Sequence, residues 1–162
     1  MSYLYDSQSE QETDYLAERL AEKAKPGSLL VLNGDLGAGK TRFSQAFAAA
    51  LGVREIVNSP TFVIIKEYEG DQMPFYHMDV YRLSMEEADE LGLEEYFDGE
   101  GVTLVEWGEL IKELLPEERL DIWIERLGAQ ERRIRLIPVG ERYQKWCEQL
   151  QDEQILLQEE HS

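Results

Sequence analysis

The sequence predicts an α/β fold in which amphipathic helices cover a mixed sheet of parallel and antiparallel strands. Two short apolar runs without alternation, at residues 28–33 and 102–105, are typical of strands buried on both faces. Segments with helical spacing of apolar residues lie between such runs, and alternating segments near the C-terminus indicate antiparallel pairing. At 162 residues the chain is long enough for one domain. We therefore expect residues 1–162 to form a single domain, with about ten frayed residues at its C-terminus.

Each element in the first third of the chain has a local signal. A capping box at residues 9–12 begins a helix whose apolar spacing continues to residue 24, and Pro26-Gly27 ends it. The apolar strand at residues 28–33 follows. A second helix then spans residues 43–51 and ends at Gly52.

The rest of the chain predicts a first hairpin, a capped helix, a buried strand and a closing hairpin. A short helix and a C-terminal helix accompany them. In order, these are strands at residues 61–69 and 75–83, a helix at 84–97, a strand at 102–105, a helix at 110–115, strands at 120–127 and 133–139, and a helix at 142–157.

Composition and charge exclude several classes of protein. The chain holds 34 acidic and 16 basic residues, a formal net charge of −18. Its average surface repels tRNA or DNA, so contact with nucleic acid requires a local basic patch or a partner protein. The single cysteine, Cys147, excludes an intrachain disulfide and fits a reducing compartment. No secretory signal or apolar run of membrane-spanning length is present, so we expect a cytoplasmic protein that contacts no membrane.

Residues 34–41, Gly-Asp-Leu-Gly-Ala-Gly-Lys-Thr, match the phosphate-binding pattern G-x-x-x-x-G-K-[ST]. The glycines allow successive N–H groups to surround an anion, Lys40 supplies positive charge to the β- and γ-phosphates, and the Thr41 hydroxyl ligates Mg²⁺. The match follows an apolar strand and precedes an amphipathic helix, which is the context that this loop requires. The sequence therefore predicts a three-layer fold of the P-loop NTPase type.

Two further acidic residues are candidates for the same site. Glu106 ends an apolar strand and is the expected Mg²⁺ carboxylate, although a surface glutamate would also fit and Glu109 is a competitor. Asp79 shares a strand face with His77 and Tyr81, and it either orients a water or belongs to a polar strand face.

The two remaining features are a turn and a basic segment. Thr61 follows the turn at Ser59-Pro60, where it either senses the γ-phosphate or serves turn geometry. Residues 119–145 carry a local charge of +3, and Arg133 and Arg135 alternate with apolar residues there. These arginines either protect an edge strand or face nucleotide, RNA or a partner.

Together the motifs resemble a known family. The loop at 34–41, Ser-Pro-Thr-Phe at 59–62, His-Met-Asp-Val-Tyr-Arg at 77–82 and Val-Glu-Trp at 105–107 occur in the order and spacing of the bacterial tRNA threonylcarbamoyladenosine-biosynthesis ATPases, the TsaE family. The resemblance spans nearly the whole chain. It implies a Mg²⁺-dependent ATPase of weak intrinsic activity that belongs to the machinery forming N6-threonylcarbamoyladenosine at position 37 of tRNAs reading ANN codons. It also implies two partners, TsaB-like and TsaD-like, through which the chain reaches tRNA.

Two other functions remain alternatives: a small-molecule kinase with the same loop, and a nucleotide-gated module without catalysis.

The resemblance also implies roles for individual residues. By position, the resemblance implies that the phosphates are held by Leu36, Gly37, Ala38, Gly39, Lys40 and Thr41, and that Mg²⁺ is held by Thr41 and Glu106. It implies that catalysis uses Lys40, Asp79 and Thr61. It also places Glu10 and Thr13 near the adenine and Arg133 close to the site.

Overall fold

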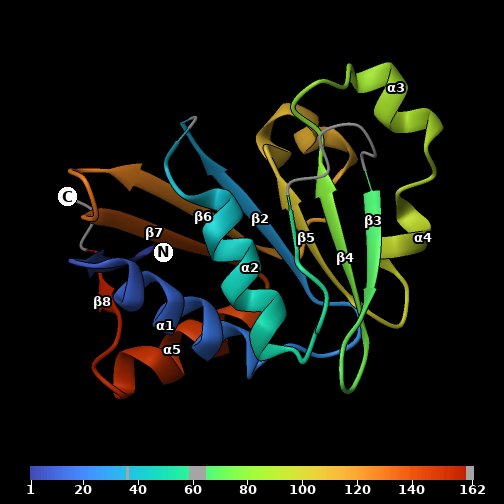
Figure 1. Cartoon of the computed structure of the whole chain (residues 1–162). Coiled ribbons are helices and arrows are strands. Elements are labelled where there is room, and N and C mark those ends of the chain that lie inside the picture. The colour runs from blue at the N-terminus through green and yellow to red at the C-terminus, as the bar shows by residue number, and fades with distance from the viewer. Residues whose placement is uncertain (36, 59–64, 160–162) are drawn as a thin grey trace.

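The computed structural model describes residues 1–35, 37–58 and 65–159, and within them the chain forms one eight-stranded mixed sheet with helices on both faces (Figure 1). The strand order is β3-β4-β5-β2-β6-β7-β1-β8. The predicted α/β class and mixed sheet are confirmed. The strands are β1 (Tyr3–Ser7), β2 (Leu29–Gly34), β3 (Ile65–Glu69), β4 (Pro74–Asp79), β5 (Val102–Glu106), β6 (Arg119–Arg126), β7 (Arg132–Val139) and β8 (Leu157–Gln158).

The middle of the sheet is parallel. Strand β5 pairs in parallel with β4 and with β2, and β2 pairs in parallel with β6. In this register Glu106 lies beside both Asp79 of β4 and Leu32 of β2. The carboxyl ends of three strands therefore meet at one edge, where ligands of open α/β sheets bind.

Antiparallel strands extend the sheet on both sides. Strand β3 pairs with β4, β6 with β7, and β1 with both β7 and β8. The sequence did not predict β1 or β8. The C-terminal helix, expected to run to residue 157, ends at Asp152, and the chain then returns to pair with β1.

The helices form the two outer layers. Helices α1 (Glu10–Ala21), α2 (Lys40–Ala50) and α5 (Glu141–Asp152) cover one face and bury the larger apolar core against it. Helices α3 (Met85–Glu90) and α4 (Glu94–Phe97) and the 3₁₀ helix η1 (Gly108–Leu114) enclose a second core on the other face. The helix predicted at 84–97 is two helices, broken where Gly92 takes a positive φ of 66°. None of the helices in the described ranges is long and apolar enough to cross a membrane.

Candidate functional site

The glycine-rich loop connects β2 to α2 and needs glycine for steric reasons. Gly34 has a φ of +147°, and a Cβ there would lie 2.4 Å from the backbone oxygen of Ile124. Gly39 precedes the helix with a φ of 106°, a left-handed conformation that glycine adopts at little cost. The loop can therefore follow β6 closely. Leu36, expected in the phosphate cradle, lies outside the described residues.

Lys40 is the first residue of α2, and its side chain folds back into the loop. The ammonium donates hydrogen bonds to the backbone oxygens of Gly34 at 2.7 Å and Asp35 at 2.9 Å. It also lies 3.9 Å from the centre of the Trp107 ring. Burial lowers the pKa of Lys40, against the opposing effect of nearby carboxylates, of which Glu106 is the strongest. A cation is thus held in the loop, at the start of a helix.

Asp79 and Glu106 lie side by side at the carboxyl ends of β4 and β5. They are register partners on parallel strands, so their side chains leave the sheet on the same face, the face that α2 covers. Both carboxylates favour the charged form of Lys40. The backbone N–H of Tyr81 donates to Asp79 Oδ1 at 3.0 Å. The structure therefore brings together three residues that the sequence assigned to one site.

Glu106 is almost fully buried, with 2% of its surface exposed. Its Oε2 lies 2.5 Å from His77 Nε2 and 3.4 Å from Ser44 Oγ. The Ser44 hydroxyl has a shorter hydrogen bond, 2.9 Å, to the backbone oxygen of Lys40. His77 is therefore the main donor to this carboxylate. Glu106 is not the surface glutamate of the alternative interpretation.

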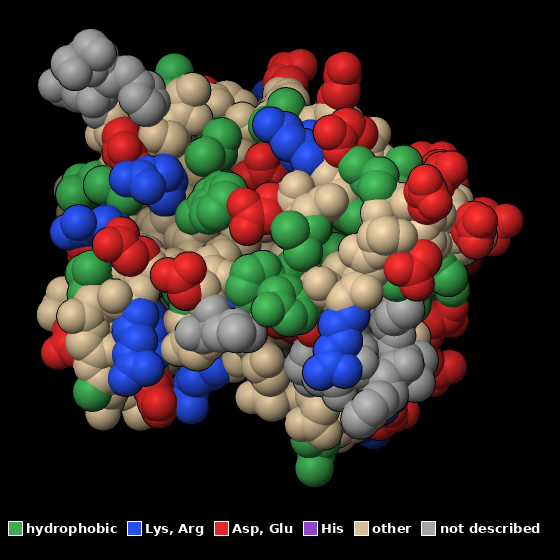
Figure 2. All heavy atoms as spheres, turned by 90° about the horizontal axis from the view of Figure 1, so that it is seen from above, with side chains coloured by type: hydrophobic (Ala, Val, Ile, Leu, Met, Phe, Trp, Pro, Cys, Tyr) green, Lys and Arg blue, Asp and Glu red, His purple; other side chains and the backbone are tan. Residues whose placement is uncertain are grey.

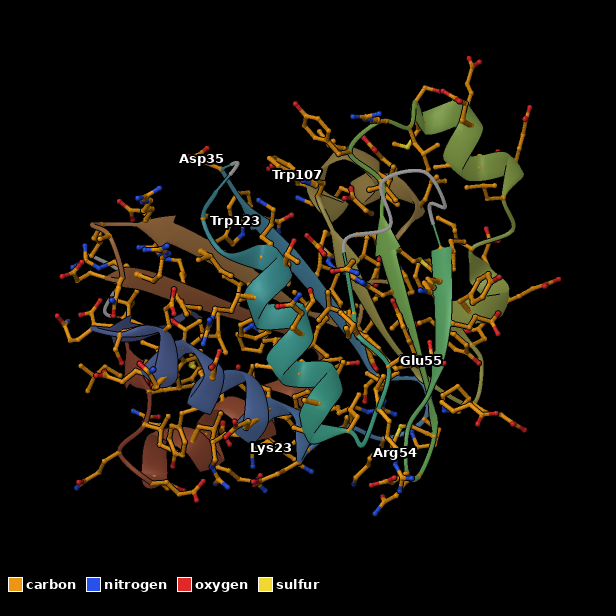
Figure 3. The ribbon with its side chains drawn as sticks, viewed as in Figure 1. Lys23, Asp35, Arg54, Glu55, Trp107 and Trp123 are labelled. Atoms are coloured by element: carbon orange, nitrogen blue, oxygen red, sulfur yellow. The ribbon has the colours of Figure 1, made fainter. Side chains whose placement is uncertain are left out.

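Trp107 follows Glu106 and forms one wall of the site. Its φ is 65°, uncommon for a residue with a side chain, and its N–H donates to the backbone oxygen of Leu32 at 2.8 Å. Its ring contacts the Tyr81 ring, with centres 4.7 Å apart, as well as Lys40. Figure 3 shows Trp107 and Asp35 at the same edge of the molecule. Figure 2 looks onto this edge, and acidic side chains gather there on the side of α3 and α4.

Arg132, at the start of β7, contacts the loop, although the sequence pattern had pointed to its neighbours. Its Nε donates to the backbone oxygen of Ala38 at 2.7 Å. Arg133 and Arg135 project from the opposite face of the strand, where they pair with Asp6 and Glu159.

Strand periodicity could have identified Arg132. It shares a face with Ile134 and Leu136, which belong to the larger core and therefore face the helices. The same alternation places Arg133 and Arg135 away from the phosphate-binding loop.

The other predicted residues occupy varied positions. Thr41 is half-buried in the first turn of α2, and Thr61 lies outside the described residues. Glu10 pairs with Arg42 of α2 at 3.1 Å. Thr13 is buried, with its hydroxyl 2.7 Å from Ser7 Oγ.

The oxygen ligands at this edge fit a magnesium ion bound together with a nucleotide. In the described part of the chain, no group of three or more His, Cys, Asp or Glu side chains could hold a metal by itself. Magnesium needs no such group, because it usually binds through one or two protein oxygens together with phosphate and water oxygens. The Thr41 hydroxyl and the Glu106 carboxylate supply oxygens of that kind.

Comparisons with known proteins agree with one another. The family model described as threonylcarbamoyl adenosine biosynthesis protein TsaE matches residues 7–134. The tRNA threonylcarbamoyladenosine biosynthesis protein TsaE of Bacillus subtilis is 56% identical over 140 residues, 86% of this chain and 88% of the relative. The protein of the same name from Streptomyces coelicolor is 40% identical, covering 79% of this chain and 91% of the relative. The crystal structure of Bacillus subtilis YdiB aligns with a TM-score of 0.83 at 48% identity, covering 95% of this chain and 97% of that chain.

Proposed function

The chain belongs to the TsaE family of threonylcarbamoyl adenosine biosynthesis proteins, and we propose that it binds and hydrolyses Mg-ATP for the machinery that forms threonylcarbamoyladenosine in tRNA. Membership makes it a component of that machinery. The observation that carries the proposal is the position of the Lys40 ammonium. It lies inside the phosphate-binding loop, with Asp79 and Glu106 at the same sheet edge.

Binding of the triphosphate uses the loop and the start of α2. Residues 36–41 provide backbone N–H groups and the positive end of the helix dipole. Lys40 exchanges its two backbone oxygens for phosphate oxygens. Arg132 holds the loop through the backbone oxygen of Ala38 and adds positive charge beside it.

Thr41 and Glu106 are the residues that would hold the magnesium ion. When bound, the ion neutralises charge on the β- and γ-phosphates. Glu106 is buried and held by His77, so little of its conformational freedom remains to be lost on binding. Thr41 lies at the first turn of the helix that carries Lys40.

Asp79 is the candidate for orienting the attacking water. It ends β4 next to Glu106, and its Oδ1 accepts the N–H of Tyr81, which fixes the carboxylate at the sheet edge. A water held there attacks the γ-phosphate in line, with charge neutralised by Lys40 and the loop N–H groups. The role of Thr61 next to the γ-phosphate stays part of the proposal, since this residue lies outside the described ranges.

Partner proteins would complete the reaction. Arg132, the arginine at the loop, is already engaged with three backbone oxygens, those of Ala38, Gly128 and Glu131. A slow intrinsic rate follows if a partner must supply further positive charge to the transition state. The net charge of −18 disfavours direct binding to tRNA, so we assign contact with adenosine 37 of tRNAs reading ANN codons to TsaB-like and TsaD-like partners.

The test is a reconstituted reaction with the two partners, scored for threonylcarbamoyladenosine in tRNA and for released phosphate. Wild type is compared with Asp79→Asn and Glu106→Gln, with nucleotide binding followed by calorimetry. We expect both variants to bind nucleotide and lose turnover. If tRNA is modified at the normal level without phosphate release, the result would favour a nucleotide-gated role over hydrolysis. Phosphate transfer to an added acceptor would instead favour a kinase.

A further inference from the structure

His77 is a buried imidazole next to the proposed magnesium ligand Glu106. It lies on β4, two residues before Asp79, and is 0% exposed. In register it faces Leu104 of β5, two residues before Glu106. The ring therefore lies in the core directly beneath the two carboxylates of the site.

The contacts of this ring are asymmetric. One side stacks on Phe75, with ring centres 5.9 Å apart and planes 17° from parallel. Nε2 contacts Glu106 Oε2 at 2.5 Å. Nδ1 is buried and has no hydrogen-bond partner among the described residues. Among the described residues, the imidazole of His77 therefore makes its hydrogen bond to Glu106.

A histidine that only filled the core would be an unfavourable choice. A buried nitrogen without a partner costs free energy that leucine or methionine would avoid. At this position the unpaired Nδ1 is accompanied by one hydrogen bond, between Nε2 and a carboxylate. That carboxylate is the one we assign to magnesium.

Glu106 depends on His77 for its orientation. The other nearby donor, Ser44, has one proton and makes its shorter hydrogen bond to the backbone oxygen of Lys40. Among the carboxylates around Lys40, that of Glu106 has the largest effect on the ammonium. Without the imidazole, attraction by Lys40 would draw the carboxylate toward the phosphate-binding loop.

We propose that His77 is a positioning residue of the magnesium site. Its Nε2–H holds Oε2 of Glu106 and leaves Oε1 for the magnesium ion of bound Mg-ATP. The inference rests on the proposed function, because it requires Glu106 to act on the metal. In histidine–carboxylate pairs at metal sites, one residue binds the metal and the other commonly fixes its orientation through a hydrogen bond on the side away from the metal.

The experiment measures how strongly magnesium and ATP binding are coupled. ATP affinity is determined by calorimetry with Mg²⁺ and with EDTA, and the ratio of the two affinities is compared between variants. His77→Gln retains an N–H donor near the position of Nε2, and His77→Leu removes it. Thr103→Val is the matched control, since Thr103 is buried in the adjacent strand and its hydroxyl has no partner among the described residues.

We expect His77→Leu to lower this ratio roughly tenfold to a hundredfold, the usual range for loss of a hydrogen bond behind a metal ligand. His77→Gln should recover most of the ratio, and Thr103→Val should match wild type. An unchanged ratio in His77→Leu would overturn the inference and leave His77 as core packing. A wild-type protein without any magnesium effect would overturn the proposed function as well, which separates the two failures.

A second measurement on the unmodified protein avoids dependence on the folding of His77→Leu. Long-range ¹H–¹⁵N spectra report the protonation of both ring nitrogens. We expect a protonated Nε2 whose resonance differs between the ATP complex with Mg²⁺ and the complex in EDTA. Identical His77 resonances in the two complexes would refute a positioning role.

Discussion

Raising the pH should weaken nucleotide binding through loss of the Lys40 charge. Burial lowers the pKa of Lys40 below its usual 10.5, although Glu106 and Asp79 act in the opposite direction. Phosphate oxygens would hold the ammonium charged and raise its pKa in the complex. Binding therefore takes up a proton wherever the pH lies between these two pKa values. Affinity is full below the pKa of the free protein and falls above it, by up to tenfold per pH unit.

The contribution of Lys40 to the stability of the free protein has the opposite dependence on pH. The folded pKa of Lys40 lies below the unfolded one, so burying the charged form costs stability at neutral pH. That cost disappears as the pH rises from the folded toward the unfolded pKa. Cys147 and Tyr3 act in the opposite direction, because burial raises the pKa of Cys147 to about 12 and also raises that of Tyr3, so the fold loses stability as the pH rises above their unfolded pKa values. Lys40 thus favours the free fold and opposes binding over the same alkaline range.

The size of the Lys40 contribution follows from the hydrogen bonds it exchanges. Two charge-assisted bonds to phosphate contribute about 3–6 kcal/mol, and releasing the backbone oxygens of Gly34 and Asp35 costs roughly 1–2 kcal/mol. The difference is about 1–5 kcal/mol. Lys40→Met should therefore lower Mg-ATP affinity about 5- to 5,000-fold.

Calorimetric titrations with Mg-ATP from pH 7 to pH 10 test both parts of this argument. Wild type should lose affinity toward high pH, and Lys40→Met should bind weakly with no comparable slope. The variant should melt at the same temperature as wild type or higher at pH 7, because a costly buried charge is removed. The same slope in Lys40→Met, or unchanged Mg-ATP affinity in that variant, would refute the assignment of this lysine to the phosphates.

Three other substitutions test the surroundings of the site. Gly34→Ala places a Cβ 2.4 Å from the oxygen of Ile124 and should cost at least about 2 kcal/mol, a fall in melting temperature of roughly 4–8 °C; an unchanged melting temperature would contradict this. Arg132→Gln removes a charged donor to Ala38 and should lower Mg-ATP affinity about tenfold in calorimetry, whereas unchanged affinity would exclude Arg132 from binding. Thr103→Val removes a buried hydroxyl without a partner in the described chain and should raise the free energy of unfolding by up to about 1 kcal/mol in urea titrations; a clear loss would reveal a missed contact.

The central strands and the main helices could be predicted because their signals are local. The apolar run at residues 28–33 is β2 with a shift of one residue, and the Ser84 capping box forms with both of its hydrogen bonds. Strand β1 has no such signal: its burial does not alternate, and pairing with β7 makes it a strand. The break at Gly92 was missed because a single glycine within a helical pattern is often tolerated.

Candidate site residues could be chosen from the sequence where a local motif or one strand end carried enough information. Lys40 follows from the loop motif, and Glu106 from its place at the end of an apolar strand. That Asp79 lies beside Glu106 could not be read from the sequence, because it depends on the register between β4 and β5. The pairing of His77 with Glu106 needs the same register together with burial of both side chains.

In the free site, Lys40, Glu106 and Arg132 already make hydrogen bonds within the protein, and these bonds determine which contacts nucleotide binding must break. Lys40 must leave two backbone oxygens to reach a phosphate, so its strong charge yields only the difference between two sets of hydrogen bonds. Glu106 can keep His77 while it meets magnesium, because the described hydrogen bonds to its carboxylate fall on one oxygen. Arg132 can likewise keep Ala38, since that contact uses Nε alone. Affinity should therefore be most sensitive to pH at Lys40, whereas substitutions at His77 and Arg132 should act by loosening the groups that they hold.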